Sequence, residues 1–466
     1  MYIASSQQVR EADRLTIHQY HIPSSELMER AGRGAAQIVM ERFPDRMTSF
    51  LVLAGQGNNG GDGRVVARYL QEAGYKVAIN LPLKDWKVKK SVIVDALFGI
   101  GLSRPIVDPQ ASLIRDVNSS KHFVVSLDIP SGLHADTGEV CGVCVRADLT
   151  ITFGAVKWGL LKESAHEWVG ELVSVDICYP VDVCEALKFQ DIWVDRDFVQ
   201  SWVTPRKRSS HKGSYGHLLA LGGSAKKPGS IMLSGYAALR SGSGLVTVAL
   251  PEIAFRKFPK DFLELMFEPL PSQKNGEFGK VTKNNLLKKI ERKTALAIGP
   301  GMGTSKGSHD FLKMVIENSN LPMVIDADGL NLLANDPKLL KKLSGRSVIL
   351  TPHPGEIGRL SNSPQPPLKL RGGEDRFEHA RAFAQKHQIY LLLKGYRTVM
   401  ATPRGKLYVN STGNPAMATA GMGDTLTGII GSLLAQGYDV EKRWSWDAGF
   451  MGLLEILWPS VLGIGG

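Results

Sequence analysis

Asp424 lies where a glycine turn meets a helix, and its carboxylate is the first candidate for chemistry in this sequence. Residues 414–434 read NPAMATAGMGDTLTGIIGSLL, in which two glycines flank Met422 and apolar residues then recur at helical spacing. The start of a helix offers unpaired N–H groups and the positive end of the helix dipole, and both favour a bound anion. Asp424 is therefore either a residue that caps the helix over 425–434 or a general base beside a bound phosphate group.

A second group of polar side chains follows glycine turns in the first half of the chain. The segment GQGNNGGDG at residues 55–63 carries two adjacent asparagines and Asp62. Asp95 and Asp128 each end an apolar, strand-like run, and Lys157 follows another. Open α/β sheets bind ligands at the carboxyl ends of neighbouring parallel strands. These residues are therefore either turn-capping groups or parts of one site.

The glycine segment also satisfies the spacing of a dinucleotide-binding turn. Gly55, Gly57 and Gly60 form G-x-G-x-x-G between a strand and a helix. The next strand, YKVAIN, ends in Asn80 instead of the acidic residue that usually contacts the ribose of NAD. A hydride-transferring dehydrogenase is therefore disfavoured.

The second half of the chain repeats this arrangement with different side chains. Asp326 and Asp328, His353 between two prolines, and Lys394 all follow strand-like runs. Each alone is compatible with a turn or a helix cap. Together with Asp424 they supply cations, N–H groups and a carboxylate, which a phosphoryl-transfer site needs. No G-x-x-x-x-G-K-[ST] run occurs, so the sequence predicts no P-loop.

Strands that alternate with helices must position both groups. We expect a helical region over residues 5–43, a buried strand over 50–54 and a helix over 64–74. The same strand, glycine loop and helix order recurs beyond residue 210, which predicts a second parallel α/β sheet. The pattern weakens before the exposed-looking basic run RKR, so we place a boundary between domains 1–204 and 205–466.

Length and composition limit the classes of function. A chain of 466 residues is too long for one ordinary hydrophobic core. The net charge of +11 suits acidic partners, but no zinc finger, RNP-type run or basic-aromatic interleaving indicates nucleic acid, so we expect phosphate-bearing metabolites. No signal-peptide core and no run of about eighteen apolar residues occurs, so we expect a cytoplasmic protein without a membrane span.

The cysteines allow either a zinc site or reduced, buried thiols. No His completes a zinc-ligand spacing, and reduced thiols are the default inside cells. We therefore expect free, buried thiols at Cys141, Cys144, Cys178 and Cys184.

Four blocks of the first half, in order, resemble the NAD(P)H-hydrate epimerase family. They are GQGNNGGDG, VDALFGIGLSRP, LDIPSGLHADTG and TFGAVKWG, within residues 3–176. The resemblance implies a Rossmann-like three-layer α/β/α domain that epimerises C6 of hydrated nicotinamide nucleotides and holds K⁺ on Asn59, Asp95 and Ser131, oxygen ligands that suit a hard cation. Asp128 becomes the candidate proton acceptor or donor, with Lys157 as its electrostatic partner. The implied substrate contacts are Asn58, Asn59, Gly60, Gly61, Asp62, Gly99, Ile100, Gly101, Leu102, Ser103, Arg104, Pro105 and Asp128.

The second half resembles the ADP- or ATP-dependent NAD(P)H-hydrate dehydratase family, which has a ribokinase-like α/β fold. The blocks span residues 210–437 and include SHKGSYG, IGPGMG, VIDADGLN, TPHPGE, LLKGYRTVM and NPAMATAGMGDTLTGII. The implied contacts to the hydrated nicotinamide are Gly301, His353 and Asp424. The implied contacts to the adenine nucleotide are Lys394, Gly395, Tyr396, Arg397, Thr398 and Gly423, with Mg²⁺ bridging the phosphates.

The whole chain is thus similar to bifunctional enzymes that repair hydrated NADH and NADPH (NADHX and NADPHX). The resemblance implies that the R and S hydrates are interconverted at C6. It also implies that the S form is dehydrated with phosphoryl transfer from ADP or ATP, giving NAD(P)H, AMP or ADP, and phosphate. Asp424 would take the proton from the C6 hydroxyl. We also expect a homo-oligomer. The alternative is a ribokinase-like sugar or vitamin kinase fused to a nucleotide-binding module.

Two features depart from the family pattern. Met422 stands where the family's GTGD motif has Thr, which removes one hydroxyl donor near the phosphate. After residue 437 the sequence YDVEKRWSWDAGFMGLLEILWPSVLGIGG lacks the family's His-Gly-Leu-Ala-Gly-Asp type run. We therefore expect an atypical tail that leaves core surface beside the Asp424 helix uncovered.

Overall fold

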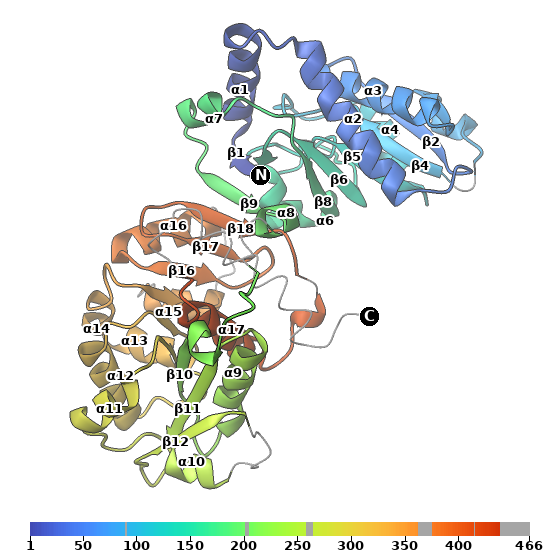
Figure 1. Cartoon of the computed structure of the whole chain (residues 1–466). Coiled ribbons are helices and arrows are strands. Elements are labelled where there is room, and N and C mark those ends of the chain that lie inside the picture. The colour runs from blue at the N-terminus through green and yellow to red at the C-terminus, as the bar shows by residue number, and fades with distance from the viewer. Residues whose placement is uncertain (89–90, 201–204, 258–263, 362–374, 414, 439–466) are drawn as a thin grey trace. The chain divides into compact units, whose positions relative to one another are not determined.

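The computed structural model of the chain separates into two compact units, Met1–Trp193 and Val194–Gly466 (Figure 1). It describes residues 1–88, 91–200, 205–257, 264–361, 375–413 and 415–438. We call the two parts the N-terminal unit and the C-terminal unit. Both are α/β, as the alternating pattern predicts. The boundary at 204/205 stays a prediction, because residues 201–204 lie outside the described residues.

The N-terminal unit is built on a parallel sheet whose strand order is β3-β2-β4-β5-β6-β8. Its four central strands are mostly apolar and almost entirely buried, which is typical of a sheet that is covered on both faces. They are β2 (Ser49–Ala54), β3 (Lys76–Ile79), β4 (Ser91–Ala96), β5 (Phe123–Leu127), β6 (Leu149–Phe153) and β8 (Glu171–Val175).

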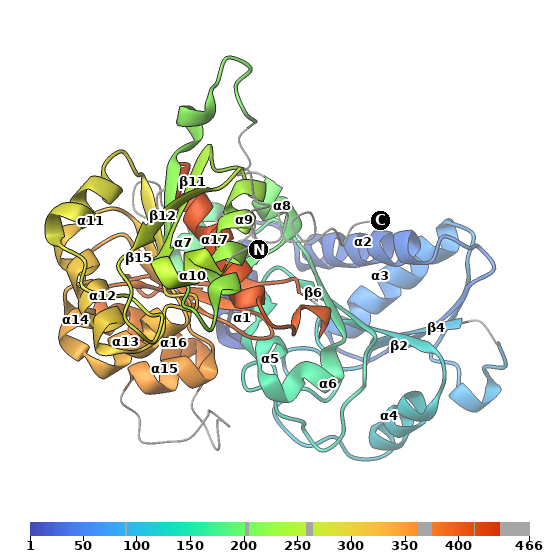
Figure 2. The ribbon, with the colours of Figure 1, turned by 90° about the horizontal axis from the view of Figure 1, so that it is seen from below.

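Helices cover both faces of this sheet and confirm the predicted three-layer arrangement. Helices α2 (Ser24–Arg42) and α3 (Asn58–Glu72) pack on the face that carries Phe50 and Val52. Helix α4 (Gln110–Ser119) packs on the face that carries Leu51. Figure 2 shows α2 and α3 on one side of β2 and β4, with α4 on the other.

The helical region predicted over residues 5–43 is two helices. Helix α1 (Ser6–Gln19) begins with a capping box between Ser5 and Gln8. The chain then breaks at His21, whose φ is 55°, and at Pro23, which precedes α2. The prediction of a helical region is confirmed, and the apolar periodicity does not show the local break within it.

Short elements complete the N-terminal unit. Strand β1 (Tyr2–Ala4) pairs in parallel with β7 (Val156–Lys157) and antiparallel with β9 (Asp191–Val194). The remaining helices are η1 (Leu83–Asp85), α5 (Trp158–Leu161), η2 (Glu163–Ala165), α6 (His166–Val169) and α7 (Val181–Ala186).

The C-terminal unit contains a sheet in the order β12-β11-β10-β13-β14-β15-β16-β17-β18. The pairs from β12 to β16 are parallel, and β16, β17 and β18 form an antiparallel meander. The strands are β10 (His217–Leu221), β11 (Leu245–Pro251), β12 (Met266–Leu270), β13 (Ala295–Ile298), β14 (Met323–Ile325), β15 (Val348–Leu350), β16 (Tyr390–Leu393), β17 (Val399–Ala401) and β18 (Leu407–Asn410).

Two helices of the C-terminal unit, α9 (Pro228–Arg240) and α17 (Met422–Ala435), lie side by side against the sheet (Figure 1). A Cβ on Gly428 would lie 2.0 Å from the carbonyl oxygen of Ser234, so only glycine permits this approach. The other helices are α8 (Arg196–Gln200), η3 (Lys212–Tyr215), α10 (Glu252–Arg256), α11 (Lys283–Ile290), α12 (Lys306–Asn318), α13 (Asp328–Asn335), α14 (Pro337–Lys341), α15 (Pro354–Leu360), α16 (Arg376–His387) and η4 (Pro415–Met417).

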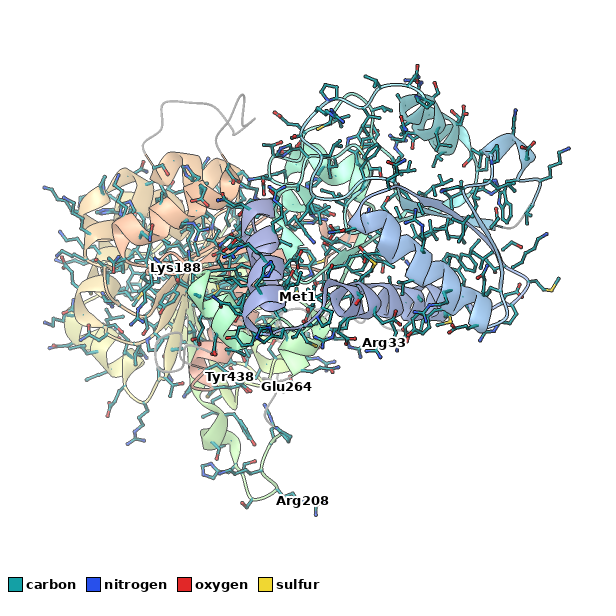
Figure 3. All side chains as sticks on the ribbon, turned by 90° about the horizontal axis from the view of Figure 1, so that it is seen from above. Met1, Arg33, Lys188, Arg208, Glu264 and Tyr438 are labelled. Carbon is teal, nitrogen blue, oxygen red and sulfur yellow. The ribbon has the colours of Figure 1, made fainter. Side chains whose placement is uncertain are left out.

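The basic run before β10 is exposed. Residues 205–209 are all exposed, and Figure 3 shows Arg208 at the outer end of this segment. Solvated side chains of this kind agree with the interpretation of RKR as a linker.

Candidate active sites

A cavity of about 1220 Å³ opens beside the carboxyl ends of β2, β4 and β5 in the N-terminal unit. Most of the residues proposed from sequence to contact substrate line it. Gly60, Gly61 and Pro105 do not. The lining residues from the proposed set are Asn58, Asn59, Asp62, Gly99, Ile100, Gly101, Leu102, Ser103, Arg104 and Asp128, and Lys157, the proposed partner of Asp128, lines it too.

The segment predicted as a glycine loop is mostly the first turns of a helix. Helix α3 begins at Asn58 rather than at residue 64. A Cβ on Gly60 would lie 2.0 Å from the carbonyl oxygen of Gly55, and a Cβ on Gly61 would lie 2.5 Å from the Met28 side chain. These two glycines therefore let the turn pack closely, and this packing aims Asn59 and Asp62 into the cavity.

Asp128 and Lys157 form a buried ion pair at the base of the cavity. The Lys157 side chain is 1% exposed, and its Nζ is bonded to Oδ1 of Asp128, to Oγ1 of Thr152 at 3.1 Å and to the carbonyl oxygen of Phe153 at 2.8 Å. Asp128 has a φ of 62°, a conformation that non-glycine residues rarely adopt and that is concentrated at functional sites. The sequence placed Lys157 in a loop after a strand-like run, whereas Lys157 ends the buried strand β7.

Two further carboxyl groups face the same cavity. Asp62 is buried, and its burial, reinforced by the charge of Asp128, raises its pKa to about 8. Asp13, on α1, accepts a hydrogen bond of 2.6 Å from the hydroxyl of Tyr179, and burial raises its pKa as well. The cavity therefore holds carboxyl groups of unequal acidity.

Oxygen atoms suited to a hard cation lie beneath the cavity. The amide nitrogen of Asn59 donates to the carbonyl oxygens of Phe98 at 2.8 Å and Leu127 at 3.1 Å. Its Oδ1 is buried and has no hydrogen-bond partner among the described residues. An amide oxygen left unpaired in this way is available to a cation.

Asp95 lies in the same region and is fully buried. Its carboxylate accepts hydrogen bonds from Ser126 Oγ at 2.8 Å, from Ser131 N at 2.9 Å and from Ser131 Oγ at 2.6 Å. Burial raises its pKa, and no basic side chain within the described ranges forms an ion pair with it. A buried carboxylate of this kind, with the free oxygen of Asn59, fits a bound monovalent cation.

Free thiols rather than a zinc site are found in this unit. Cys141, Cys144, Cys178 and Cys184 are unpaired, and the described part of the chain has no group of three His, Cys, Asp or Glu side chains that could hold a metal. Cys144 and Cys184 are buried as expected. Cys178 is exposed, so burial of all four was a wrong expectation.

The C-terminal unit places Asp424 in the first turn of α17. The helix begins at Met422 after Gly421, whose φ of 88° requires the freedom of glycine. Burial raises the pKa of the Asp424 carboxyl, and the charge of Asp326 adds to this, whereas a hydrogen bond from Ser230 and nearby Lys394 oppose it. Asp424 is therefore a partly buried carboxylate beside unpaired helical N–H groups.

A lysine bridges two carboxylates next to Asp424. Lys394 Nζ lies 2.9 Å from Oδ1 of Asp326 and 3.8 Å from Oε2 of Glu356. The other oxygen of Asp326 accepts a hydrogen bond of 2.8 Å from Thr427 Oγ1, on α17. A Cβ on Gly423 would lie 3.4 Å from Lys394 Nζ, so this glycine lies directly against the lysine.

His353 and Gly301 border the same strand ends. His353 caps α15, where its Nδ1 accepts from Gly355 N at 3.0 Å and its own N–H donates to Glu356 at 2.9 Å. Its ring is about half exposed. Gly301 has a φ of 64°, and a Cβ there would lie 2.7 Å from the carbonyl oxygen of Lys227 at the start of α9. Both residues thus lie on loops that converge towards the start of α17.

The segment proposed to hold the nucleotide presents its side chains unequally. The side chain of Tyr396 is exposed, whereas Arg397 is buried with a φ of 53°, and burial lowers its pKa. Thr398 Oγ1 donates to the carbonyl oxygen of Gly395 at 2.9 Å. The Tyr396 side chain is therefore the exposed one in this loop, and the guanidinium carbon of Arg397 lies 5.1 Å from its ring centroid.

Several site residues were not selected from the sequence. Asp13 looked like an ordinary polar position on an amphipathic helix, and Tyr179 carried no motif. Asp326, by contrast, was among the residues selected because they follow strand-like runs. Glu356 and Thr427 became recognisable only through their contacts with Lys394 and Asp326.

Apart from Tyr438, the atypical tail after residue 437 lies outside the described residues. In the described residues no helix is both long enough and apolar enough to cross a membrane.

Comparison with known proteins gives matches to both halves of the chain. A family model described as NAD(P)H-hydrate dehydratase matches residues 218–449, and one described as YjeF-related protein N-terminus matches residues 24–91 and 80–159. The Bifunctional NAD(P)H-hydrate repair enzyme Nnr of Moorella thermoacetica is 35% identical over 94% of this chain and 88% of its own. The protein of the same name from Coxiella burnetii is 37% identical over 92% and 89%.

A solved structure is similar to the second half. The ADP/ATP-dependent NAD(P)H-hydrate dehydratase from Bacillus subtilis, co-crystallised with ATP and Mg²⁺, is 26% identical with a TM-score of 0.41, over 58% of this chain and 98% of that one.

Proposed function

Because the chain belongs to the family of bifunctional NAD(P)H-hydrate repair enzymes, we propose that its two units catalyse two steps in the repair of NADHX and NADPHX. The N-terminal unit interconverts the R and S hydrates at C6 of the nicotinamide ring. The C-terminal unit dehydrates the S form with phosphoryl transfer from ADP or ATP. The products are NADH or NADPH, AMP or ADP, and phosphate.

The position of Asp424 carries the proposal for dehydration. Asp424 removes the proton of the C6 hydroxyl, because its carboxylate is partly buried and has a raised pKa. The unpaired N–H groups at Gly423 and the ammonium of Lys394 stabilise the phosphoryl group during transfer. Loss of the phosphate ester then restores the C5–C6 double bond. Gly301 and His353 border the hydrated ring in this proposal.

The loop after β16 contributes to nucleotide binding. The exposed Tyr396 ring offers an aromatic surface for the adenine base, beside the guanidinium of Arg397 at 5.1 Å from the ring centroid. Buried Arg397 keeps the loop in shape. When Mg²⁺ is bound, it neutralises charge on the phosphates. One or two carboxylates, together with substrate phosphates, commonly hold this ion. Asp326 and Asp424 are carboxylates beside this site that would do so.

The ion pair of Asp128 and Lys157 carries the proposal for epimerisation. Asp128 transfers a proton at the C6 hydroxyl, and Lys157 stabilises its charged form. Asn59, Asp95 and Ser131 would hold K⁺, which supplies a fixed positive charge beneath the cavity when bound. Substitution of Asp128 by alanine is expected to slow epimerisation by about 10² to 10⁴-fold; a variant that epimerises at the native rate contradicts this role.

We further propose that the enzyme acts in the cytoplasm as a homo-oligomer on these nucleotides, without nucleic acid or a membrane. Size measurement by light scattering tests the assembly, and a monomer at micromolar concentration contradicts it.

One assay separates this function from the kinase alternative. Purified protein is mixed with NADHX and ADP or ATP, and the absorbance of the dihydronicotinamide and the free phosphate are followed together. Repair predicts equal amounts of both products. A sugar or vitamin kinase would instead leave a stable phosphorylated alcohol and restore no dihydronicotinamide.

A further inference from the structure

The buried part of the N-terminal cavity contains an unequal set of charges. Asp13, Asp62 and Asp128 line it from α1, α3 and the residue after β5, whereas Lys157 is the ammonium that lies among them. Two arginines that also line the cavity, Arg10 and Arg104, have exposed side chains. One lysine therefore has to balance carboxyl groups from several elements.

Asp62 differs from the other two aspartates in its partners. Asp128 is bonded to Lys157, and Asp13 accepts the hydroxyl of Tyr179. The carboxyl group of Asp62 forms no hydrogen bond or ion pair with the residues that the structure describes, although it is only 9% exposed. A carboxyl group buried without a partner is disfavoured as an anion.

We propose that Asp62 is a second catalytic residue for the epimerisation assigned above, acting as the proton donor where Asp128 acts as the proton acceptor. This inference rests on the proposed function of the N-terminal unit. Asp62 and Asp128 line the same cavity from different elements, and the charge of Asp128 acts on Asp62, so one bound ring can lie within reach of both groups. Such pairs divide the acid and base roles when their environments differ.

The reaction balances with these two groups and water. The lone pair on N1 of the ring forms an N1=C6 double bond as the C6–O bond breaks, and the departing hydroxyl takes the proton of Asp62 and leaves as water. Water then adds to the opposite face of C6 and gives a proton to Asp128. Asp62 ends as an anion and Asp128 as an acid, so the reverse epimerisation starts from this state, and exchange with solvent restores the first.

The surroundings keep Asp62 protonated at neutral pH. Burial and the charges of Asp128 and Asp13 raise its pKa to about 8, and Lys157 opposes them. Asp13 therefore acts through Asp62 as a positioning residue, and the hydroxyl of Tyr179 holds it in place. The acidic groups of the neighbouring elements have partners of their own: Glu29 of α2 is bonded to Arg68 and Tyr69, and Asp95 of β4 is bonded to Ser126 and Ser131.

The test follows epimerisation without nucleotide, so that dehydration cannot occur. The full chain, the variant Asp62→Asn and the control Asp116→Asn are mixed with (R)-NADHX, and the R to S ratio is followed by chromatography from pH 6 to pH 9.5, values chosen to bracket the pKa of about 8. Asp116 is exposed on α4 and is not among the residues that line the cavity.

The native chain should lose kcat/KM as pH rises through about 8, because Asp62 then loses its proton. Asp62→Asn should lower kcat/KM by about 10²-fold or more and abolish this decline. Asp116→Asn should behave as the native chain. If Asp62→Asn does not fold, Asp13→Asn replaces it: loss of that charge lowers the pKa of Asp62 and should move the decline to lower pH.

The outcomes separate the two claims. No epimerisation by the native chain overturns the proposed function. A native chain that epimerises, with Asp62→Asn equally active or Asp13→Asn unchanged in its pH profile, overturns only the role of Asp62.

Discussion

The two sites use a lysine among carboxylates in opposite ways. In the N-terminal unit Lys157 is 1% exposed and bonded to Asp128. Burial there raises the pKa of Asp62 to about 8, so Asp62 keeps its proton at neutral pH. In the C-terminal unit Lys394 is 20% exposed and lies between Asp326 and Glu356. Lys157 is therefore buried among carboxyl groups, whereas Lys394 is accessible to a ligand.

This difference matches the chemistry proposed for each site. Epimerisation breaks and remakes one C–O bond with proton transfers at that oxygen, so the carboxyl groups that line the cavity can serve it without a nucleotide. Phosphoryl transfer brings in a highly charged nucleotide, and Lys394 and the N–H groups at the start of α17 remain available to it. The comparison predicts that substitutions in the two sites have separable effects.

Asp424→Asn should have the largest effect. An amide cannot accept the proton of the C6 hydroxyl, so nucleotide-dependent dehydration should fall by about 10³-fold or more, beyond the usual range for a single proton-transfer group, because Asp424 also borders the phosphoryl group. Epimerisation should be unchanged. The measurement is NADH restored from NADHX with ADP or ATP, beside R to S interconversion without nucleotide.

Glu264→Gln is the matched control, since this exposed carboxylate lies in the same unit. If Asp424→Asn dehydrates NADHX near the native rate, Asp424 is not the general base, and its role is to cap the helix.

The two lysines should differ in their contribution to stability. Lys157→Met leaves Asp128 buried without its partner, which should cost about 3–5 kcal/mol in the free energy of unfolding of the N-terminal unit. Lys394→Met should cost about 1–2 kcal/mol, because the buried Asp326 keeps the hydroxyl of Thr427 and water can enter where the 20% exposed lysine was. Urea unfolding, followed for each unit, measures both. Equal costs would contradict the contrast between a sealed and an open lysine.

The sequence predicted local features of both sites better than their contacts. The apolar run after Gly423 was enough to place α17, and apolar strands followed by polar residues were enough to place Asp128 and Asp326 at strand ends. The burial of Lys157 could not be predicted. It depends on the parallel pairing of β7 with β1, residues far apart in the chain.

The same limit explains the N-terminal helices and the acidic cluster. The periodicity of residues 5–43 indicated a helix but not the turn at His21, which lets α1 leave α2 and bring Asp13 to the cavity. The partner of Asp13, Tyr179, comes from beyond β8. Long-range packing of this kind leaves no local pattern in the sequence.

Asp326→Asn should shift the pH dependence of dehydration. The pKa of Asp424 is raised by burial and, in part, by the charge of Asp326. The base must be ionised, so the rate rises as pH rises through this pKa. Removal of the Asp326 charge lowers the pKa of Asp424, which should move the rising part of the pH profile to lower pH. A shift of up to about one pKa unit would change the rates on that part by up to about tenfold. The measurement is kcat/KM between pH 4.5 and 7, a range chosen around the usual carboxyl values. If the rising part of this pH profile is the same in Asp326→Asn and in the native chain, the two carboxylates are not coupled.

The smallest predicted effect concerns the cation, which we assign to the N-terminal unit alone. Asn59 Oδ1 is buried without a partner and Asp95 without an ion pair among the described residues, so K⁺ bound there should stabilise this unit. Exchange of K⁺ for Li⁺ at equal ionic strength should lower its thermal midpoint by a few degrees, equivalent to about 1 kcal/mol. Asn59→Ala should abolish the difference between the two salts, whereas the exposed Asn284→Ala, in the C-terminal unit, should retain it. If the thermal midpoint of the native chain is the same in K⁺ and in Li⁺, the hydrogen bonds from Ser126 and Ser131 alone stabilise the buried carboxylate of Asp95.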